Sequence, residues 1–328
     1  MVQVDSWFEC GDGTKLYLRR WKTESASQPG SALQPLAVVH ILHGMAEHSQ
    51  RYSRLAEKLC GAGIEVWAAD QRGHGKTADL SVNDPGKGGI LGHCTDNDTF
   101  KQIADDAHGI NQTILKTLPG IPLFLMGHSW GSFIAQHYIE NHDCKDLAGC
   151  ILSGTRGPDD RLKVGAGIPL MSFLAAMRGQ RRGSSIARAL ADGAYNRHFS
   201  PNRTPFDWIS RDETEVDAYV NDPLCGFLCS AGFYRDLTKG LYRIHMKEAM
   251  ARIRRDMPVY IFCGGGDPVG GMGAGPAALV NAYRSLGLKK LEFAHYPGAR
   301  HEVLNETNRE EVMDNLLSWI CRITNSKE

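Results

Sequence analysis

Short, continuous apolar segments alternate with helical segments along most of this chain. The apolar segments lack the in-and-out alternation of a half-exposed strand, so they are typical of a parallel sheet that is covered on both faces. Between them, apolar side chains recur at helical spacing, for instance at Ile103, Ala107 and Ile110. Repeated strand and helix units of this kind predict an α/β fold with a mostly parallel sheet flanked by helices.

The alternation is interrupted once, between residues 155 and 237, where the sequence is helical in character and shows no buried strand. We therefore predict a core made of residues 1–154 and 238–328, with 155–237 inserted as a helical cap. The predicted strands cover residues 14–21, 36–42, 64–69, 122–126, 147–152, 259–263 and 290–296. The predicted helices of the core cover residues 51–61, 100–118, 129–141, 277–286 and 310–323.

Composition excludes several classes of protein. The 328 residues contain 37 Lys and Arg against 37 Asp and Glu, so the basic excess expected of a nucleic-acid-binding protein is missing. No apolar run is long enough for a transmembrane helix, and the first ten residues do not look like a secretory signal. The nine scattered cysteines favour free thiols in a reducing compartment, so we expect a cytoplasmic protein. Cys225 and Cys229 lack a matching His or Cys pair, so we expect no metal and no cofactor.

A G-x-S-x-G motif occupies residues 127–131, directly after the predicted strand 122–126 and before a predicted helix. In this setting the motif is the nucleophile elbow, a tight turn that exposes a serine hydroxyl. Side chains at Gly127 and Gly131 would collide with neighbouring backbone, which explains the two glycines. The motif predicts Ser129 as a catalytic nucleophile.

Two backbone donors are expected beside this serine. The predicted strand 36–42 runs into His43 and Gly44, where the next N–H would face the nucleophile. Together with the residue after the nucleophile, this position predicts Met45 and Trp130 as backbone donors of an oxyanion hole.

A serine nucleophile also needs a base and an acid that orients the base, and in this type of fold they follow the serine in the order acid, then histidine. Asp267 stands in a glycine-rich turn just after the predicted strand 259–263. Of the thirteen histidines, His301 lies in the loop after the last predicted strand. These positions predict Asp267 as the orienting acid and His301 as the base.

The chain resembles the monoacylglycerol lipase and lysophospholipase branch of the α/β-hydrolases, a family that includes serine aminopeptidases of type S33. The resemblance covers residues 16–323 and is carried by residues 43–49, 70–75, 127–131, 266–269 and 296–302. It implies an α/β-hydrolase fold with an eight-stranded sheet and an inserted helical cap. It also implies the triad Ser129, Asp267 and His301, and hydrolysis of an ester between a fatty acid and glycerol or a lysophospholipid.

Two other activities remain open at this point. A prolyl-aminopeptidase would need carboxylates for the substrate amine, and the acidic cluster from Asp212 to Asp217 is better explained as the solvated face of a helix. A general short-chain carboxylesterase would need only the triad. The nearly uncharged segment 168–177 suits an apolar pocket or a cap that touches a membrane surface transiently. The substrate contacts, the oligomeric state and the acyl length are not predicted.

Overall fold

The structure, a computed structural model, describes residues 1–23, 34–78, 89–158 and 161–325. The described residues form one eight-stranded sheet in the order β1-β2-β4-β3-β5-β6-β7-β8. Strands β1 and β2 pair antiparallel, β2 pairs antiparallel with β4, and the remaining pairs are parallel. The strands are β1 Val2–Glu9, β2 Lys15–Lys22, β3 Ala37–Leu42, β4 Ile64–Ala69, β5 Leu123–His128, β6 Leu147–Ser153, β7 Val259–Gly264 and β8 Leu291–Tyr296.

Every strand except β1 was predicted within two residues of its observed bounds. Strand β1 was missed because it lies at the edge of the sheet and is exposed along almost its whole length. A strand that buries no face carries no buried apolar pattern, so the sequence gives little sign of it. The central strands β3, β4, β5 and β7 are buried at every residue, which is why they were recognised.

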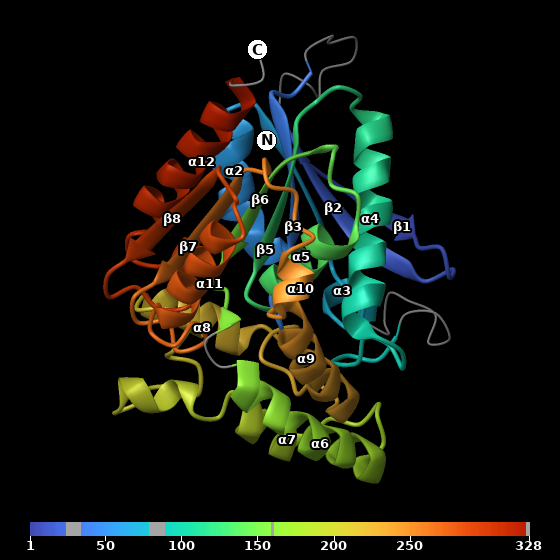
Figure 1. Ribbon diagram of the computed structural model, residues 1–328, viewed down its shortest axis with the longest axis vertical. Helices are drawn as coiled ribbons and strands as arrows, with labels where there is room; N and C mark the ends of the chain where they lie inside the picture. Colours follow the sequence, from blue (N-terminus) through green and yellow to red (C-terminus); the bar gives the residue numbers. More distant parts are fainter. Residues whose placement is uncertain (24–33, 79–88, 159–160, 326–328) are drawn as a thin grey trace.

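Helices cover both faces of the sheet, and each face has its own apolar core (Figure 1). Side chains of α2 and α12 fill the core on one face, while those of α4, α5 and α11 fill the core on the other. These core helices are α2 Ser53–Gly61, α3 Gly75–Ala78, α4 Thr99–Thr117, α5 Trp130–Asn141, α11 Ala274–Ser285 and α12 Arg309–Asn325, with short 3-10 turns η1 Ser49–Tyr52 and η4 Val303–Asn305.

The chain between β6 and β7 holds helices and no strand among its described residues. It contains α6 Arg161–Arg178, α7 Ser185–Ala191, η3 Tyr195–Phe199, α8 Glu213–Asn221, α9 Ala231–Ile244 and α10 Lys247–Met250. Figure 1 shows α6 and α7 as a layer beyond the sheet, with α9 between that layer and the core. The predicted cap boundary at residue 237 falls inside α9, and the domain limits stay a prediction.

All nine cysteines are free, and all except Cys321 are buried. No helix in the described part of the chain combines the length and the apolar character that a bilayer crossing would require.

Candidate active site

Ser129 occupies a sharp turn between β5 and α5. Its φ and ψ of 51° and −122° lie in a region that non-glycine residues rarely adopt. The turn is held by the Ser129 N–H, which donates to the Ser153 carbonyl of β6 at 2.9 Å. The Ser129 side chain does not cap the helix that follows, so its hydroxyl is not used for a structural hydrogen bond there.

Close backbone approaches explain the two glycines of the motif. A Cβ at Gly127 would lie 2.3 Å from the Gly131 carbonyl oxygen, and a Cβ at Gly131 would lie 2.1 Å from the Leu42 carbonyl oxygen. Both distances are far below a normal contact, so a side chain at either position would force the turn, α5 or β3 to move.

The structure brings His301 and Asp267 together in the loops that follow β8 and β7. The His301 Nδ1 and Asp267 Oδ1 atoms are 3.0 Å apart, and both side chains are buried. The Val269 N–H also donates to Asp267 Oδ1, at 2.8 Å. Because Asp267 accepts from Nδ1–H, the imidazole is held with its other nitrogen, Nε2, free of the proton in the neutral state.

Ser129 and His301 line the same cavity, but no hydrogen bond joins them, and His301 Nε2 is buried without a partner. Burial opposes protonation of His301, but the Asp267 carboxylate outweighs burial and raises the pKa of the imidazole above its usual value. The ring is further held between Trp208 and His128, whose ring centroids lie 5.2 Å and 4.9 Å from its own.

The loop between β3 and η1, residues 43–48, passes beside Ser129, and we call it the oxyanion loop. Met45 of this loop and Trp130 line a cavity together with Ser129. Neither N–H donates to another group within the described chain. Two unpaired donors beside the serine hydroxyl could hold a negatively charged oxygen.

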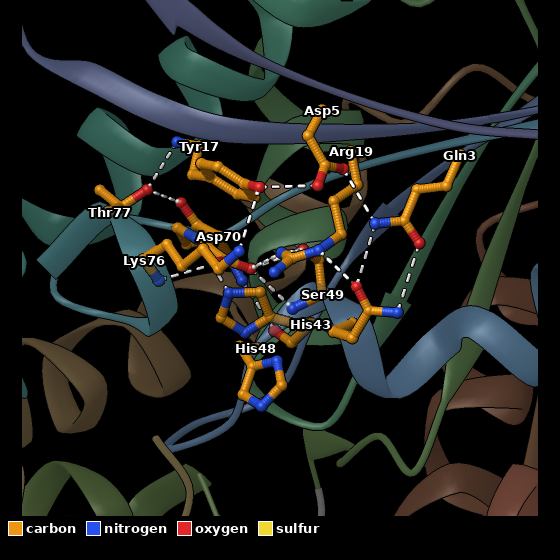
Figure 2. A network of polar contacts seen from close by, with 12 residues as sticks. Gln3, Asp5, Tyr17, Arg19, His43, His48, Ser49, Asp70, Lys76 and Thr77 are labelled. Carbon is orange, nitrogen blue, oxygen red and sulfur yellow. Dashed lines mark hydrogen bonds and ion pairs between the residues drawn. The ribbon is translucent and has the colours of Figure 1, made fainter. Parts of the chain in front are cut away.

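Buried polar contacts fix the start of the oxyanion loop. The Gln71 N–H donates to His43 Nε2 at 2.9 Å, so the His43 proton is on Nδ1, which donates to the Gly44 carbonyl at 2.8 Å. Asp70 Oδ1 accepts from the Ser49 N–H and from Arg19 Nη1 (Figure 2). Burial disfavours the Asp70 carboxylate, but Arg19 in particular holds its pKa below the usual value.

Glu47 ties the oxyanion loop to the loop that carries His301. One Glu47 oxygen accepts from the Gly44 N–H and from the Tyr52 hydroxyl. The other accepts from Arg51 at 2.7 Å, and Arg51 also makes a bidentate ion pair with Glu302, with distances of 2.7 Å and 2.6 Å. Glu302 directly follows His301, so one buried network positions both loops.

Two cavities have Ser129 in their walls. The larger cavity has a volume of about 310 Å³, and apolar side chains from α5, α6 and α9 dominate its wall, among them Phe133, Met171 and Leu241. The smaller cavity, of about 40 Å³, contains His301 in its wall. Met45, Ser129, Asp192 and Trp208 line both.

Comparison with known proteins agrees with this architecture. The profile of the family "Serine aminopeptidase, S33" matches residues 33–308, which is most of the chain. The chain belongs to the serine aminopeptidase S33 family. The predicted α/β-hydrolase fold is confirmed.

Several relatives of this S33 hydrolase act on esters. The monoacylglycerol lipase of Mycolicibacterium smegmatis is 31% identical over 291 residues, which are 87% of this chain and 88% of that protein. The human monoglyceride lipase is 30% identical over 253 residues, which are 75% of this chain and 66% of the human protein. A carboxyl esterase of Bacillus coagulans, solved with glycerol, superposes with a TM-score of 0.86 at 28% identity and covers 99% of both chains. The prediction of a serine ester hydrolase is confirmed.

The S33 hydrolase has polar cavity residues that the sequence analysis missed. Arg188 and Asp192 from the end of α7 reach the smaller cavity. Asp192 Oδ1 is buried without a partner, and burial raises the pKa of this carboxyl to about 6, although Arg188 opposes the shift. Nothing in the sequence around α7 marks them, because their role depends on how the cap packs over the sheet. The acidic residues 212–217 do not line the two cavities; Asp212 and Asp217 pair with arginines instead.

Proposed function

We propose that this protein hydrolyses monoacyl lipids, either monoacylglycerol or lysophospholipid, and releases the fatty acid through an acyl-enzyme. Ser129 is the nucleophile, His301 the base, and Asp267 the acid that orients the base. The backbone N–H groups of Met45 and Trp130 form the oxyanion hole. The observation that carries the proposal is the apolar cavity of about 310 Å³ that opens at Ser129, beside the His301–Asp267 pair.

The proposed reaction begins when Ser129 Oγ attacks the ester carbonyl and His301 Nε2 takes its proton. The carbonyl oxygen becomes negative and receives hydrogen bonds from the Met45 and Trp130 N–H groups. When the carbon–oxygen bond to the alcohol breaks, His301 returns the proton to the alcohol oxygen. Water then attacks the acyl-enzyme, again with His301 as the base, and releases the fatty acid.

The two cavities suggest how the substrate lies. His301 must reach the departing alcohol, so the smaller cavity, which has His301 in its wall, suits the glycerol or phosphoglycerol part. The larger cavity lacks His301 and is lined by apolar side chains, so it suits the acyl chain. Asp192, at the junction, could accept a hydrogen bond from a hydroxyl of the alcohol part.

Asp192 is also the carboxyl that an aminopeptidase would need for a substrate amine. The Arg188 guanidinium disfavours that use, because it lies 3.9 Å from this carboxylate and would repel an ammonium group. An ester of a neutral alcohol fits this environment better.

The test is hydrolysis of 2-acylglycerol, lysophosphatidylcholine, short p-nitrophenyl esters and a prolyl amide by the wild type and by Ser129→Ala. We expect turnover of the monoacyl lipids and loss of at least about 10⁴-fold in the variant. Turnover of only the short esters would support a general carboxylesterase, and turnover of only the amide would support a peptidase. Equal activity of the variant would overturn the role of Ser129.

A further inference from the structure

One segment of the chain between β6 and β7 lies directly against the oxyanion loop. We call residues 219–226 the clasp segment. The Ala46 carbonyl accepts two hydrogen bonds from it, one from the Tyr219 hydroxyl at 3.0 Å and one from the Gly226 N–H at 2.9 Å. Ala46 itself has a positive φ of 54°, so the clasp segment supports a loop conformation that is costly for alanine.

Three side chains with metal-binding atoms meet at this contact. His48 comes from the oxyanion loop, and Asp222 and Cys225 come from the clasp segment; one ligand atom of each lies within 4.8 Å of the other two. His48 Nε2 and Asp222 Oδ2 are already 2.8 Å apart. In the described part of the chain, no other three such residues come together in this way.

Among the described residues, the ligating atoms make no hydrogen bond to a residue outside this group of three. His48 Nε2 pairs only with Asp222, and His48 Nδ1 is buried with no hydrogen bond at all. Figure 2 shows the His48 ring pointing away from the polar network around Asp70, with no dashed line reaching it. The thiol of Cys225 is buried and makes no hydrogen bond in the described chain.

This donor set suits zinc better than magnesium or calcium, which prefer oxygen ligands only. Tetrahedral zinc with one nitrogen, one oxygen and one sulfur ligand places these atoms roughly 3.3–3.6 Å apart. The three side chains would therefore need shifts of about 1 Å or less. Asp222 is 31% exposed, so an ion can enter from that side and keep a water molecule as its fourth ligand.

We propose that His48, Asp222 and Cys225 bind one Zn²⁺ ion, which fastens the clasp segment to the oxyanion loop. The sequence prediction of no metal considered Cys225 with Cys229 and looked for a second pair of ligands. Of these two cysteines, the proposed site uses only Cys225. Its other two ligands are Asp222, three residues before Cys225, and His48, 177 residues before Cys225. This inference concerns binding and does not depend on which ester the enzyme cleaves.

Zinc binding at this site must displace the thiol proton of Cys225. The thiolate is the form that binds the metal, so uptake of Zn²⁺ releases this proton. Because an unfolded chain would not hold the three ligands together, bound zinc also raises the melting temperature.

The experiment titrates metal-free protein with Zn²⁺ against a chromophoric chelator, and repeats the titration with Co²⁺. We expect one ion per chain and a thiolate-to-cobalt charge-transfer band. In Cys225→Ser the band disappears, and the affinity falls by more than about a hundredfold, because loss of an outer-shell partner alone costs 10–100-fold. A single cooperative thermal unfolding transition of the metal-free variant shows that the variant is folded.

Cys321→Ser is the matched control, because Cys321 is the most accessible cysteine and lies outside the site. It keeps the affinity and the charge-transfer band of the wild type. Zinc binding that is equally tight in Cys225→Ser, or that is lost in Cys321→Ser, would overturn the proposal. So would a wild type that takes up no Zn²⁺ when the free ion is present at micromolar concentration. A protein that hydrolyses no ester but binds zinc as described would leave the site intact and contradict only the proposed function.

Discussion

The backbone around Ser129 depends on two residues that have no side chain. The closest approach is at Gly131, where a Cβ would lie 2.1 Å from the Leu42 carbonyl oxygen and 2.5 Å from that of His43. Backbone atoms of β3 cannot yield as a flexible side chain could. We therefore expect Gly131→Ala to lower the free energy of unfolding by about 3 kcal/mol, measured by chemical denaturation.

Gly61→Ala serves as the control for this prediction. Gly61 ends α2, and a Cβ there would meet no atom within 4 Å. Its free energy of unfolding should stay within about 1 kcal/mol of the wild type. Equal stability of the two variants would contradict the close approach at the elbow.

The His301–Asp267 pair predicts a specific pH dependence. In the wild type, Asp267 raises the pKa of His301 above about 6.5. If His301 is the proposed base, kcat/KM should rise with pH with a midpoint above that value, because only a neutral imidazole accepts a proton. In Asp267→Asn burial still opposes protonation, and the strongest opposing influence, the Asp267 carboxylate, is lost, so the pKa of His301 should fall. NMR titration of the His301 ring measures both values, even where the variant is nearly inactive. An unchanged ring pKa would contradict the pairing.

At the residue scale, the sequence was sufficient to predict a residue of the candidate site where local geometry dictates the residue type. The elbow could be recognised because tight turns need glycine at fixed positions. Asp267 and His301 could be located because each follows a recognisable strand. Asp192 and Arg188 could not be found, since their place in the cavity depends on how helices distant in sequence pack together. The same is true of His48 and Cys225, which come together only in the folded chain.

Among the elements, α6 is unusual because it is apolar on two sides. Val164, Gly167 and Met171 line the larger cavity. On the outward side, Leu170, Phe173 and Met177 are exposed by 47%, 60% and 69% at spacings of three and four residues. We propose that this outward side touches a membrane or lipid aggregate from which the substrate is taken.

Replacing Leu170, Phe173 and Met177 together with Gln tests this role of α6. Partition onto phosphatidylcholine vesicles, measured by sedimentation, should fall by at least about tenfold, since each buried apolar side chain contributes roughly 1.5 kcal/mol or more. Hydrolysis of dispersed long-chain monoacylglycerol should fall with it, while hydrolysis of a short soluble ester should not change.

The control for α6 replaces Val2 and Val4 of β1 with Gln. Both are about as exposed as Leu170, at 40% and 43%, but they lie on the edge strand. Their replacement should leave vesicle binding unaltered. Equal loss in both variants would show that exposed apolar area alone, rather than α6, drives binding.

At the scale of the whole molecule, the buried carboxylates determine stability in acid. Burial opposes ionisation of Glu47 and Glu302, but Arg51 outweighs it, so both have a lower pKa in the folded protein than the usual value of about 4.3. The stability that the two carboxylates contribute is fully present above the usual pKa of about 4.3. It is lost as the pH falls through their lower pKa values in the folded protein.

Arg51→Met should lower the free energy of unfolding by about 3–5 kcal/mol at pH 7, because it leaves two buried carboxylates without a cation. The difference in free energy of unfolding between variant and wild type should become smaller as the pH falls, since the carboxylates then become neutral. Urea denaturation between pH 7 and pH 3 measures both free energies. Arg54→Met is the control: Arg54 is 42% exposed in its pair with Glu215, and its loss should cost no more than about 1 kcal/mol.

The insertion between β6 and β7 leaves and re-enters the sheet at neighbouring positions. Ser153, the last residue of β6, pairs in parallel register with Phe262 of β7, so the two strands stay adjacent whatever joins them. The β6–β7 connection can therefore change in length and composition through evolution without shifting the register of a single strand. Ser129, Asp267 and His301 would keep their places while the walls around them are exchanged. In this architecture the substrate preference can therefore change during evolution while the type of reaction is kept.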